Sequence, residues 1–93
     1  MVILTRARQK TTTFKLYAPE ARRVTVAGSF NGWNADALSA KKDSRGTWSL
    51  KINLKPGRYE YRFVVDGSWV NDPNCTACVP NEFGSCNCTI DIK

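Results

Sequence analysis

The chain has 93 residues, 42% of them hydrophobic and 24% charged, and these proportions describe one globular domain rather than a disordered segment. It contains no histidine, so the side chain most often used for acid–base catalysis and for activating a serine or cysteine nucleophile is absent. None of the 8 acidic residues is clearly paired with a second in the sequence, as a glycosidase requires, and we therefore expect no enzymatic activity.

The net charge is +6, and it comes from small basic groups spread along the chain. We interpret it as a solvated basic surface rather than a nucleic-acid site. No apolar run approaches the length of a membrane span, and the first residues contain no continuous apolar signal region. These absences predict a cytoplasmic protein that binds neither membrane nor nucleic acid.

The N-terminal residues 1–10 form a short basic segment, and we expect them to be loosely ordered ahead of one domain at 11–93. Period-2 alternation or β-branched and aromatic residues predict strands over 11–17, 23–29, 37–41, 47–54 and 87–92. Trp48 alternates with leucine and isoleucine, so we expect it in the core. Turn residues separate the strands, and a loop is predicted over 72–84.

The stretch 59–70 predicts a hairpin around which the other strands are organised. Asp66-Gly67 lies between alternating apolar residues, and Asp-Gly favours a two-residue type I′ turn. The turn sets a register that pairs Val65 with Ser68, Val64 with Trp69, Phe63 with Val70 and Arg62 with Asn71. Alternation then places Tyr61 and Phe63 on the core face, and Trp69 beside Arg62 on the outer face.

About six to eight short strands, regular turn signals and no helical period predict an all-β protein, an antiparallel β-sandwich. Separated motifs fall in the order and spacing of one known family. The first two motifs are 24–33, which reads Val-Thr-Val-Ala-Gly-Ser-Phe-Asn-Gly-Trp, and 56–69, which reads Pro-Gly-Arg-Tyr-Glu-Tyr-Arg-Phe-Val-Val-Asp-Gly-Ser-Trp. They are followed by Asp72-Pro73 and by Asn81 to Ser85 with Asn87. Residues 11–93 thereby resemble carbohydrate-binding module family 48, especially the glycogen-binding domain of the AMP-activated protein kinase β subunit and the isoamylase early-set domain.

The resemblance implies an immunoglobulin-like early-set sandwich that binds α-glucan without cofactor or bond cleavage. It also implies carbohydrate contacts at Trp33, Arg62, Trp69, Phe83, Ser85 and Asn87. Two of these positions depart from the kinase domain, which has lysine at Arg62 and leucine at Phe83. Arginine keeps the charge but changes the donor geometry.

The residue types fit this function independently of the family. An exposed indole is a flat apolar plate that suits the C–H face of a sugar ring, and Arg62 and Asn87 supply hydrogen-bonding groups for the hydroxyls. The alternatives are that Trp33 packs its loop, that Trp69 caps the hairpin, that Arg62 is a solvated charge, and that Asn87 satisfies loop backbone.

Four cysteines lie within a short stretch, at Cys75, Cys78, Cys86 and Cys88. Their spacing is compatible with structural zinc, two disulfides or free thiols, in that order of preference. In either cross-linked form they would position Phe83, Ser85 and Asn87, so we interpret them as structural support with no counterpart in the kinase domain.

The leading hypothesis is a non-catalytic α-glucan-binding module for glycogen or starch-like chains, which localises or regulates a glycogen-metabolising enzyme or kinase. An alternative is an early-set protein-interaction domain that has lost glycan binding, which a buried Trp33 or Trp69 would favour. A third is a nucleic-acid binder that stacks bases on the same aromatic residues, although the scattered charge speaks against it.

Overall fold

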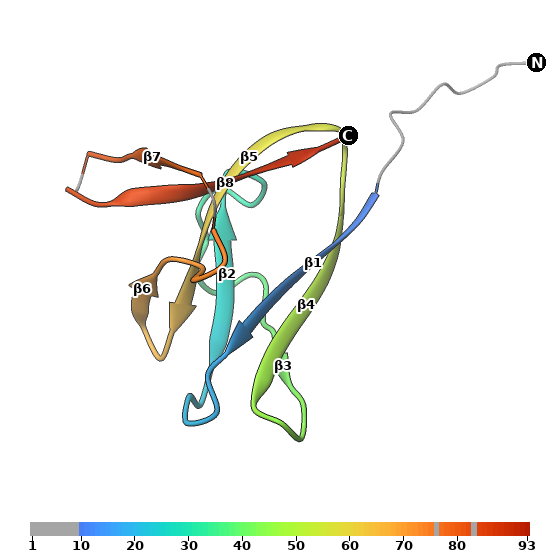
Figure 1. Cartoon of the computed structure of the whole chain (residues 1–93), viewed down its shortest axis with the longest axis vertical. Coiled ribbons are helices and arrows are strands. Elements are labelled where there is room, and N and C mark those ends of the chain that lie inside the picture. The colour runs from blue at the N-terminus through green and yellow to red at the C-terminus, as the bar shows by residue number, and fades with distance from the viewer. Residues whose placement is uncertain (1–9, 76, 83) are drawn as a thin grey trace, which may run out of the picture.

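The computed structural model describes residues 10–75, 77–82 and 84–93, and every regular element among them is a β-strand (Figure 1). The expected N-terminal segment 1–10 therefore lies almost wholly outside the described residues. The strands are β1 (Lys10–Tyr17), β2 (Val24–Gly28), β3 (Lys41–Lys42), β4 (Thr47–Leu54), β5 (Gly57–Val65), β6 (Ser68–Val70), β7 (Cys78–Pro80) and β8 (Cys86–Ile92). This part of the chain contains no helix with the length and apolarity that a membrane crossing requires.

The strands form two antiparallel sheets, as the predicted sandwich requires. One sheet has the order β1-β4-β3, and the other has the order β2-β5-β8-β7 with β6 paired to β5. In Figure 1, β1 and β4 run side by side, while β7 and the start of β8 project together at the left and β8 continues across the molecule to the C-terminus. Strands β8 and β6 pair with successive parts of β5, with residues 57–61 and 63–65 respectively.

The core lies between the two sheets because each turns an apolar face toward the other. Phe14 of β1 stacks edge-on against Tyr61 of β5, with ring centroids 4.8 Å apart. Trp48 of β4 is buried, as predicted, and its indole Nε1 donates a hydrogen bond to the Ala18 carbonyl at 2.8 Å. The other fully buried large side chains include Val24, Val26 and Phe63.

The β5–β6 hairpin has the predicted register and turn. Val65, Val64 and Phe63 pair with Ser68, Trp69 and Val70. Asp66 and Gly67 both have positive φ, 49° and 87°, as a type I′ turn requires. The Asp66 carboxylate also connects the turn to the segment before β2, because its Oδ1 accepts hydrogen bonds from the backbone N–H groups of Arg22 and Arg23 at 2.9 and 2.8 Å.

Two sequence-based expectations about strands are wrong. The predicted loop 72–84 contains β7, a three-residue edge strand whose Pro80 is tolerated because edge strands leave backbone positions unpaired. The predicted strand 37–41 is reduced to β3 and a single bridge between Ser39 and Thr25. Short strands carry too little alternation to fix their bounds.

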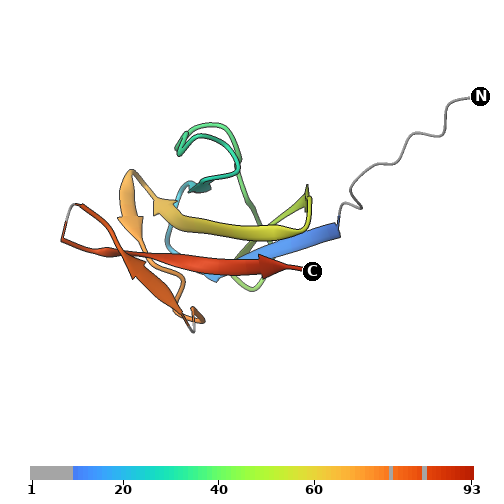
Figure 2. The same ribbon diagram turned by 90° about the horizontal axis from the view of Figure 1, so that it is seen from above.

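The outer face of the hairpin is not uniformly exposed to solvent. Val64 is only 6% exposed and Thr25 2%, although both lie on the face away from the core. The segment between β2 and β3, which stands to one side of β5 in Figure 2, brings Ala35 and Asp36 beside them. Trp69 on the same face remains 41% exposed, as predicted.

Candidate functional site

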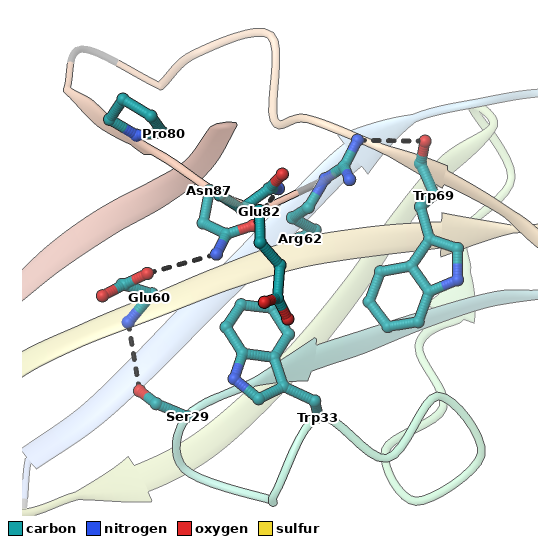
Figure 3. Close-up of a pocket in the computed structure, with 9 residues that line it drawn as sticks. Ser29, Trp33, Glu60, Arg62, Trp69, Pro80, Glu82 and Asn87 are labelled. Atoms are coloured by element: carbon teal, nitrogen blue, oxygen red, sulfur yellow. Dashed lines mark hydrogen bonds between the residues drawn. The ribbon is translucent and has the colours of Figure 1, made fainter. Parts of the chain in front are cut away.

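A broad cleft of ≈ 840 Å³ lies on the outer face of the larger sheet (Figure 3). It is lined by Ser29, Trp33, Glu60, Arg62, Trp69, Pro80, Asn81, Glu82 and Asn87. Four of the residues predicted from the sequence, Trp33, Arg62, Trp69 and Asn87, thus come together from separate parts of the chain. Two walls enclose the cleft: the tryptophan wall, made of residues 28–34 and 66–70, and the β7 wall, made of residues 78–82.

The tryptophan wall presents two indoles to the cleft. The ring centroids of Trp33 and Trp69 are 6.4 Å apart, and their planes are inclined by 40°. Trp69 is fixed by the hairpin register, which places it opposite the buried Val64. Trp33 is half-buried, so neither indole is part of the core.

Trp33 is held in an unfavourable backbone conformation. Its φ is +61°, which is uncommon for a bulky residue. The Asn31 side chain organises the loop, because its Oδ1 accepts from the Gly28 N–H at 3.0 Å and its Nδ2 donates to the Val26 carbonyl at 3.1 Å. The Trp33 N–H also donates to the Gly28 carbonyl at 2.9 Å. Strain kept in place by several hydrogen bonds is characteristic of functional positions.

Arg62 has a fixed orientation at the cleft floor. Its Nε donates to Asn71 Oδ1 at 2.8 Å, and a terminal nitrogen donates to the Trp69 carbonyl at 3.2 Å. The predicted pairing of Arg62 with Asn71 is therefore present as a side-chain hydrogen bond, and Asn71 lies one residue beyond the end of β6. Both bonds come from the hairpin itself, so the cation and the Trp69 indole are positioned by one element.

A chain of hydrogen bonds crosses the floor from one wall toward the other. Asn81 Nδ2 donates to Asn87 Oδ1 at 3.1 Å, and Asn87 Nδ2 donates to Glu60 Oε1 at 3.1 Å. The Glu60 backbone N–H in turn donates to the Ser29 hydroxyl at 3.1 Å, and Figure 3 shows both Glu60 contacts as dashed lines. These bonds orient the Asn87 amide between Asn81 and Glu60.

The sequence analysis missed five lining residues: Ser29, Glu60, Pro80, Asn81 and Glu82. Glu60 stands two residues before Arg62 on β5, so alternation puts both side chains on one face, and this pattern could have identified Glu60. The others depend on the fold of the loops. Ser85 is within the described part of the chain but does not line the cleft. Its backbone N–H donates to Asn81 Oδ1. Phe83 lies outside the described residues.

All four cysteines are free thiols, and Cys78 belongs to the β7 wall itself. Cys88 is fully buried in the core, while Asn87, its neighbour on β8, faces the opposite side and lines the cleft, as alternation along a strand requires. Burial, followed by a hydrogen bond to Cys75, raises the pKa of the Cys88 thiol to about 12. In the described part of the chain, no three cysteine, aspartate or glutamate side chains form a group that could hold a metal ion. The zinc site therefore remains a prediction from spacing alone.

The chemistry of the cleft suits a neutral polyol better than a polyanion. Flat apolar plates lie beside fixed hydrogen-bonding groups, and only one cation, Arg62, accompanies two carboxylates, Glu60 and Glu82, among the described lining residues. Carboxylates repel phosphate groups, which are the main source of affinity for nucleic acids. The geometry thus speaks against the nucleic-acid alternative.

A β-sandwich with an open aromatic cleft on one sheet is the form of a non-catalytic carbohydrate-binding module. Residues 11–93 match the protein family described as the glycogen recognition site of AMP-activated protein kinase, and the chain belongs to that family. This agrees with the resemblance found in the motifs. It also confirms the expectation that the domain is a recognition module rather than an enzyme.

Similar proteins come from plants and mammals. FLOURY ENDOSPERM 6, chloroplastic, of Oryza sativa subsp. japonica is 44% identical over 62 residues, which is 67% of this chain and 12% of that protein. PTST homolog 2, chloroplastic, of Arabidopsis thaliana is 45% identical over 53 residues, 57% of this chain and 10% of that protein. The 5'-AMP-activated protein kinase subunit beta-2 of Mus musculus is 31% identical over 87 residues, 94% of this chain and 31% of that protein. The chain therefore spans less than a third of each.

The predicted cytoplasmic location is wrong. Both plant relatives are named as chloroplastic, and they match this chain at 44% and 45% identity. The error has a physical reason: the prediction rested on the lack of an apolar signal region, whereas transit peptides to plastids are amphipathic and rich in arginine and serine.

Proposed function

We propose that the cleft binds an α-1,4-linked glucan chain of glycogen or starch. The observation that carries this proposal is the pair of indoles, Trp33 and Trp69, set 6.4 Å apart at 40° beside a polar floor. Consecutive rings of an α-linked glucan turn relative to one another, so two inclined plates suit it better than they suit a flat β-linked ribbon. Each indole would stack on one glucose ring of the curved chain.

The floor would supply the hydrogen bonds. Arg62 would donate to sugar hydroxyls, and Glu60 and Asn87 would accept and donate through the groups that their mutual bond leaves available. The resemblance adds Phe83 and Ser85 as contacts. Affinity would be modest, because the cleft is open and sugar hydroxyls stay partly in water. The exposure of Trp69 supports this function over the protein-interaction alternative.

In the whole protein the module would serve to place a partner on glucan, either a starch- or glycogen-metabolising enzyme or a kinase. The names of the relatives support such roles, since they include a kinase subunit and two chloroplastic proteins. We propose a plastid as the location for the same reason. The binding itself would require no cofactor.

The proposal is tested by titrating tryptophan fluorescence with maltoheptaose, and with cellohexaose as the β-linked control. We expect saturable binding of maltoheptaose alone. Trp69→Ala would weaken it at least about tenfold, about 1.4 kcal/mol, because one stacking plate is removed. Tyr17→Ala is the matched control: Tyr17 is an exposed aromatic, 68% accessible, on the other sheet. Absence of binding at millimolar maltoheptaose would refute glucan recognition and direct attention to a protein partner.

A further inference from the structure

The outer face of the smaller sheet, β1-β4-β3, lies on the opposite side of the core from the cleft. Burial alternates strictly along β1 from Thr11, so that Thr13, Lys15 and Tyr17 point outward while the residues between them point into the core. In Figure 1, β1, β4 and β3 lie toward the right of the molecule, and β6 and β7, which belong to the larger sheet, lie toward the left. A ligand on this outer face would therefore not cover the cleft.

The register of the smaller sheet gathers three lysines on this face. Lys15 of β1 and Lys41 of β3 are both paired with Ser49 of β4, one on each side of it. Directly paired residues of an antiparallel ladder point to the same face, so both lysines flank Ser49. Lys51 stands two residues further along β4 and shares the face. We call Lys15, Lys41 and Lys51 the lysine face, and strand spacings put their Cα atoms within about 10 Å of one another.

The outward positions around these lysines contain no carboxylate. On β1 and β4 they are threonine, serine, asparagine and one tyrosine. Both ion pairs among the described residues involve other cations. Asp43 is the carboxylate nearest to Lys41 along the chain, and it instead accepts hydrogen bonds from the backbone N–H groups of Arg45 and Thr47 at 2.8 and 3.0 Å. The charge of the lysine face is therefore not neutralised by its surroundings on the sheet.

A neighbouring residue shows how a lysine contributes to the fold. Lys42 Nζ donates to the Pro19 carbonyl at 3.3 Å and lies 5.8 Å from the centroid of the buried Trp48 ring. No ammonium group of the lysine face has a contact of this kind in the described part of the chain. Like charges on neighbouring strands repel one another, and at a separation of about 10 Å physiological salt screens that repulsion only in part. The lysine face thus opposes folding slightly and is available to an external anion.

The two sides of the sandwich differ in charge. The cleft lining combines one cation, Arg62, with two carboxylates, Glu60 and Glu82, whereas the lysine face has three cations and no carboxylate. We propose that the lysine face binds an acidic segment of a partner protein, which lies in an extended conformation across β1, β4 and β3 while the cleft stays free for glucan. Electrostatic complementarity of this kind speeds association and selects the partner.

The geometry favours a polypeptide over other anions. Alternate side chains of an extended polypeptide project on one side at intervals of about 7 Å, which is close to the spacing of the lysines. The hydroxyl and amide groups between the lysines can form hydrogen bonds with peptide groups. Nucleic acids on an open sheet need several aromatic rings for stacking, and this face has only Tyr17, paired with Thr47 near its end. A membrane-binding surface needs apolar groups beside its cations, and the outward positions here are polar.

This inference names the surface through which the module would hold its partner, and in that respect it rests on the proposed function. Because the two ligands would occupy opposite sheets, glucan and partner would bind independently. The module would then act as an adaptor with one neutral and one cationic side. Raising the salt concentration should weaken the partner contact but leave glucan binding almost unchanged, since only the first depends on opposite charges.

The test measures binding of a short fluorescently labelled peptide of alternating glutamate and serine, by anisotropy, to the 93-residue chain. A peptide of alternating glutamine and serine is the neutral control. The variant K15Q/K41Q/K51Q removes the lysine face. Its matched control, R22Q/R58Q/K93Q, removes the same number of charges from exposed positions next to or within strands of the larger sheet. Maltoheptaose affinity is measured for each protein, and peptide affinity is measured again with the cleft saturated.

We expect K15Q/K41Q/K51Q to weaken peptide binding at least about tenfold, and R22Q/R58Q/K93Q to weaken it less than about threefold. The first variant should keep its maltoheptaose affinity and have an equal or higher Tm, because it relieves repulsion; a loss of fold would lower both. Saturating maltoheptaose should change the peptide affinity less than about twofold.

Equal weakening by both triple variants would overturn the proposal, because binding would then depend on net charge alone. So would equal binding of the glutamate and glutamine peptides, or no binding of either. Tighter binding of oligothymidine or of anionic phospholipid vesicles to the lysine face than of the peptide would show that the class of partner is wrong. If the peptide binds the lysine face and maltoheptaose does not bind the cleft, the glucan function is refuted and the docking surface stands.

Discussion

The two walls of the cleft are stabilised in different ways. The tryptophan wall is fixed by local bonds, namely the type I′ turn at 66–67 and the Asn31 network that holds Trp33. The β7 wall is a three-residue strand at the sheet edge, attached to β8. The tryptophan wall is thus held by hydrogen bonds within its own turn and loop, whereas the β7 wall is held by its pairing with β8.

The largest expected effect comes from adding a single methyl group beneath the tryptophan wall. A Cβ on Gly28 would meet the Glu60 backbone oxygen at 2.5 Å and the Phe30 ring at 2.6 Å. We expect Gly28→Ala to lower the free energy of unfolding by about 3 kcal/mol, measured by urea denaturation, and to weaken glucan binding.

Gly67→Ala is the matched control, because Gly67 has φ +87° but nothing within 4 Å of an added Cβ. It should cost about 1 kcal/mol of backbone strain. Equal free energies of unfolding for Gly28→Ala and Gly67→Ala would contradict the idea that close packing of β2 on β5 fixes the tryptophan wall.

A smaller effect is expected from the hydrogen bond that anchors the segment leading into the β7 wall. The Tyr61 hydroxyl donates to Asp72 Oδ2 at 2.8 Å. Tyr61→Phe removes this bond and should lower the free energy of unfolding by about 1–2 kcal/mol near neutral pH, measured by urea denaturation.

The same residue predicts a pH dependence. Burial, and then the bond to Asp72, raises the pKa of Tyr61 above its ordinary value. The folded-state pKa exceeds the unfolded value of about 10, so this contribution is complete below about pH 10 and is lost as the pH rises further. Urea midpoints measured on both sides of pH 10 should fall less for Tyr61→Phe than for wild type. Tyr17→Phe, at an exposed site, should follow wild type, and an equal fall in all three would contradict the assignment.

The smallest effect is expected at the residue that links the two walls. Glu60→Gln keeps an acceptor for Asn87 but removes the charge that strengthens hydrogen bonds to sugar hydroxyls. Maltoheptaose affinity, measured by calorimetry, should fall about threefold, and the free energy of unfolding should change by less than about 0.5 kcal/mol. Glu20→Gln, an exposed residue outside the cleft, should leave affinity unchanged. An unchanged affinity for Glu60→Gln would exclude Glu60 as a ligand contact.

Local chemistry made the tryptophan wall predictable from the sequence. Asp66-Gly67 set the hairpin register, and the register put Trp69 beside Arg62 on the outer face. The β7 wall was not predictable in this way, since Cys-Val-Pro is too short to show alternation and becomes a strand only by pairing with β8. The burial of Val64 was likewise hidden, because it depends on a loop that folds over the sheet.

The Asp66 carboxylate that caps Arg22 and Arg23 has a consequence for the order of folding. Its contacts close a separation of 44 positions, whereas the hairpin that contains it needs only the residues on either side of one turn. Hairpins form in about 1–10 μs, and pairings between distant segments form much more slowly. Trp69 and Arg62 should therefore take up their relative positions early, and Trp33 should join them only when β2 pairs with β5. Part of the recognition surface would then be present in the chain before the protein has a core.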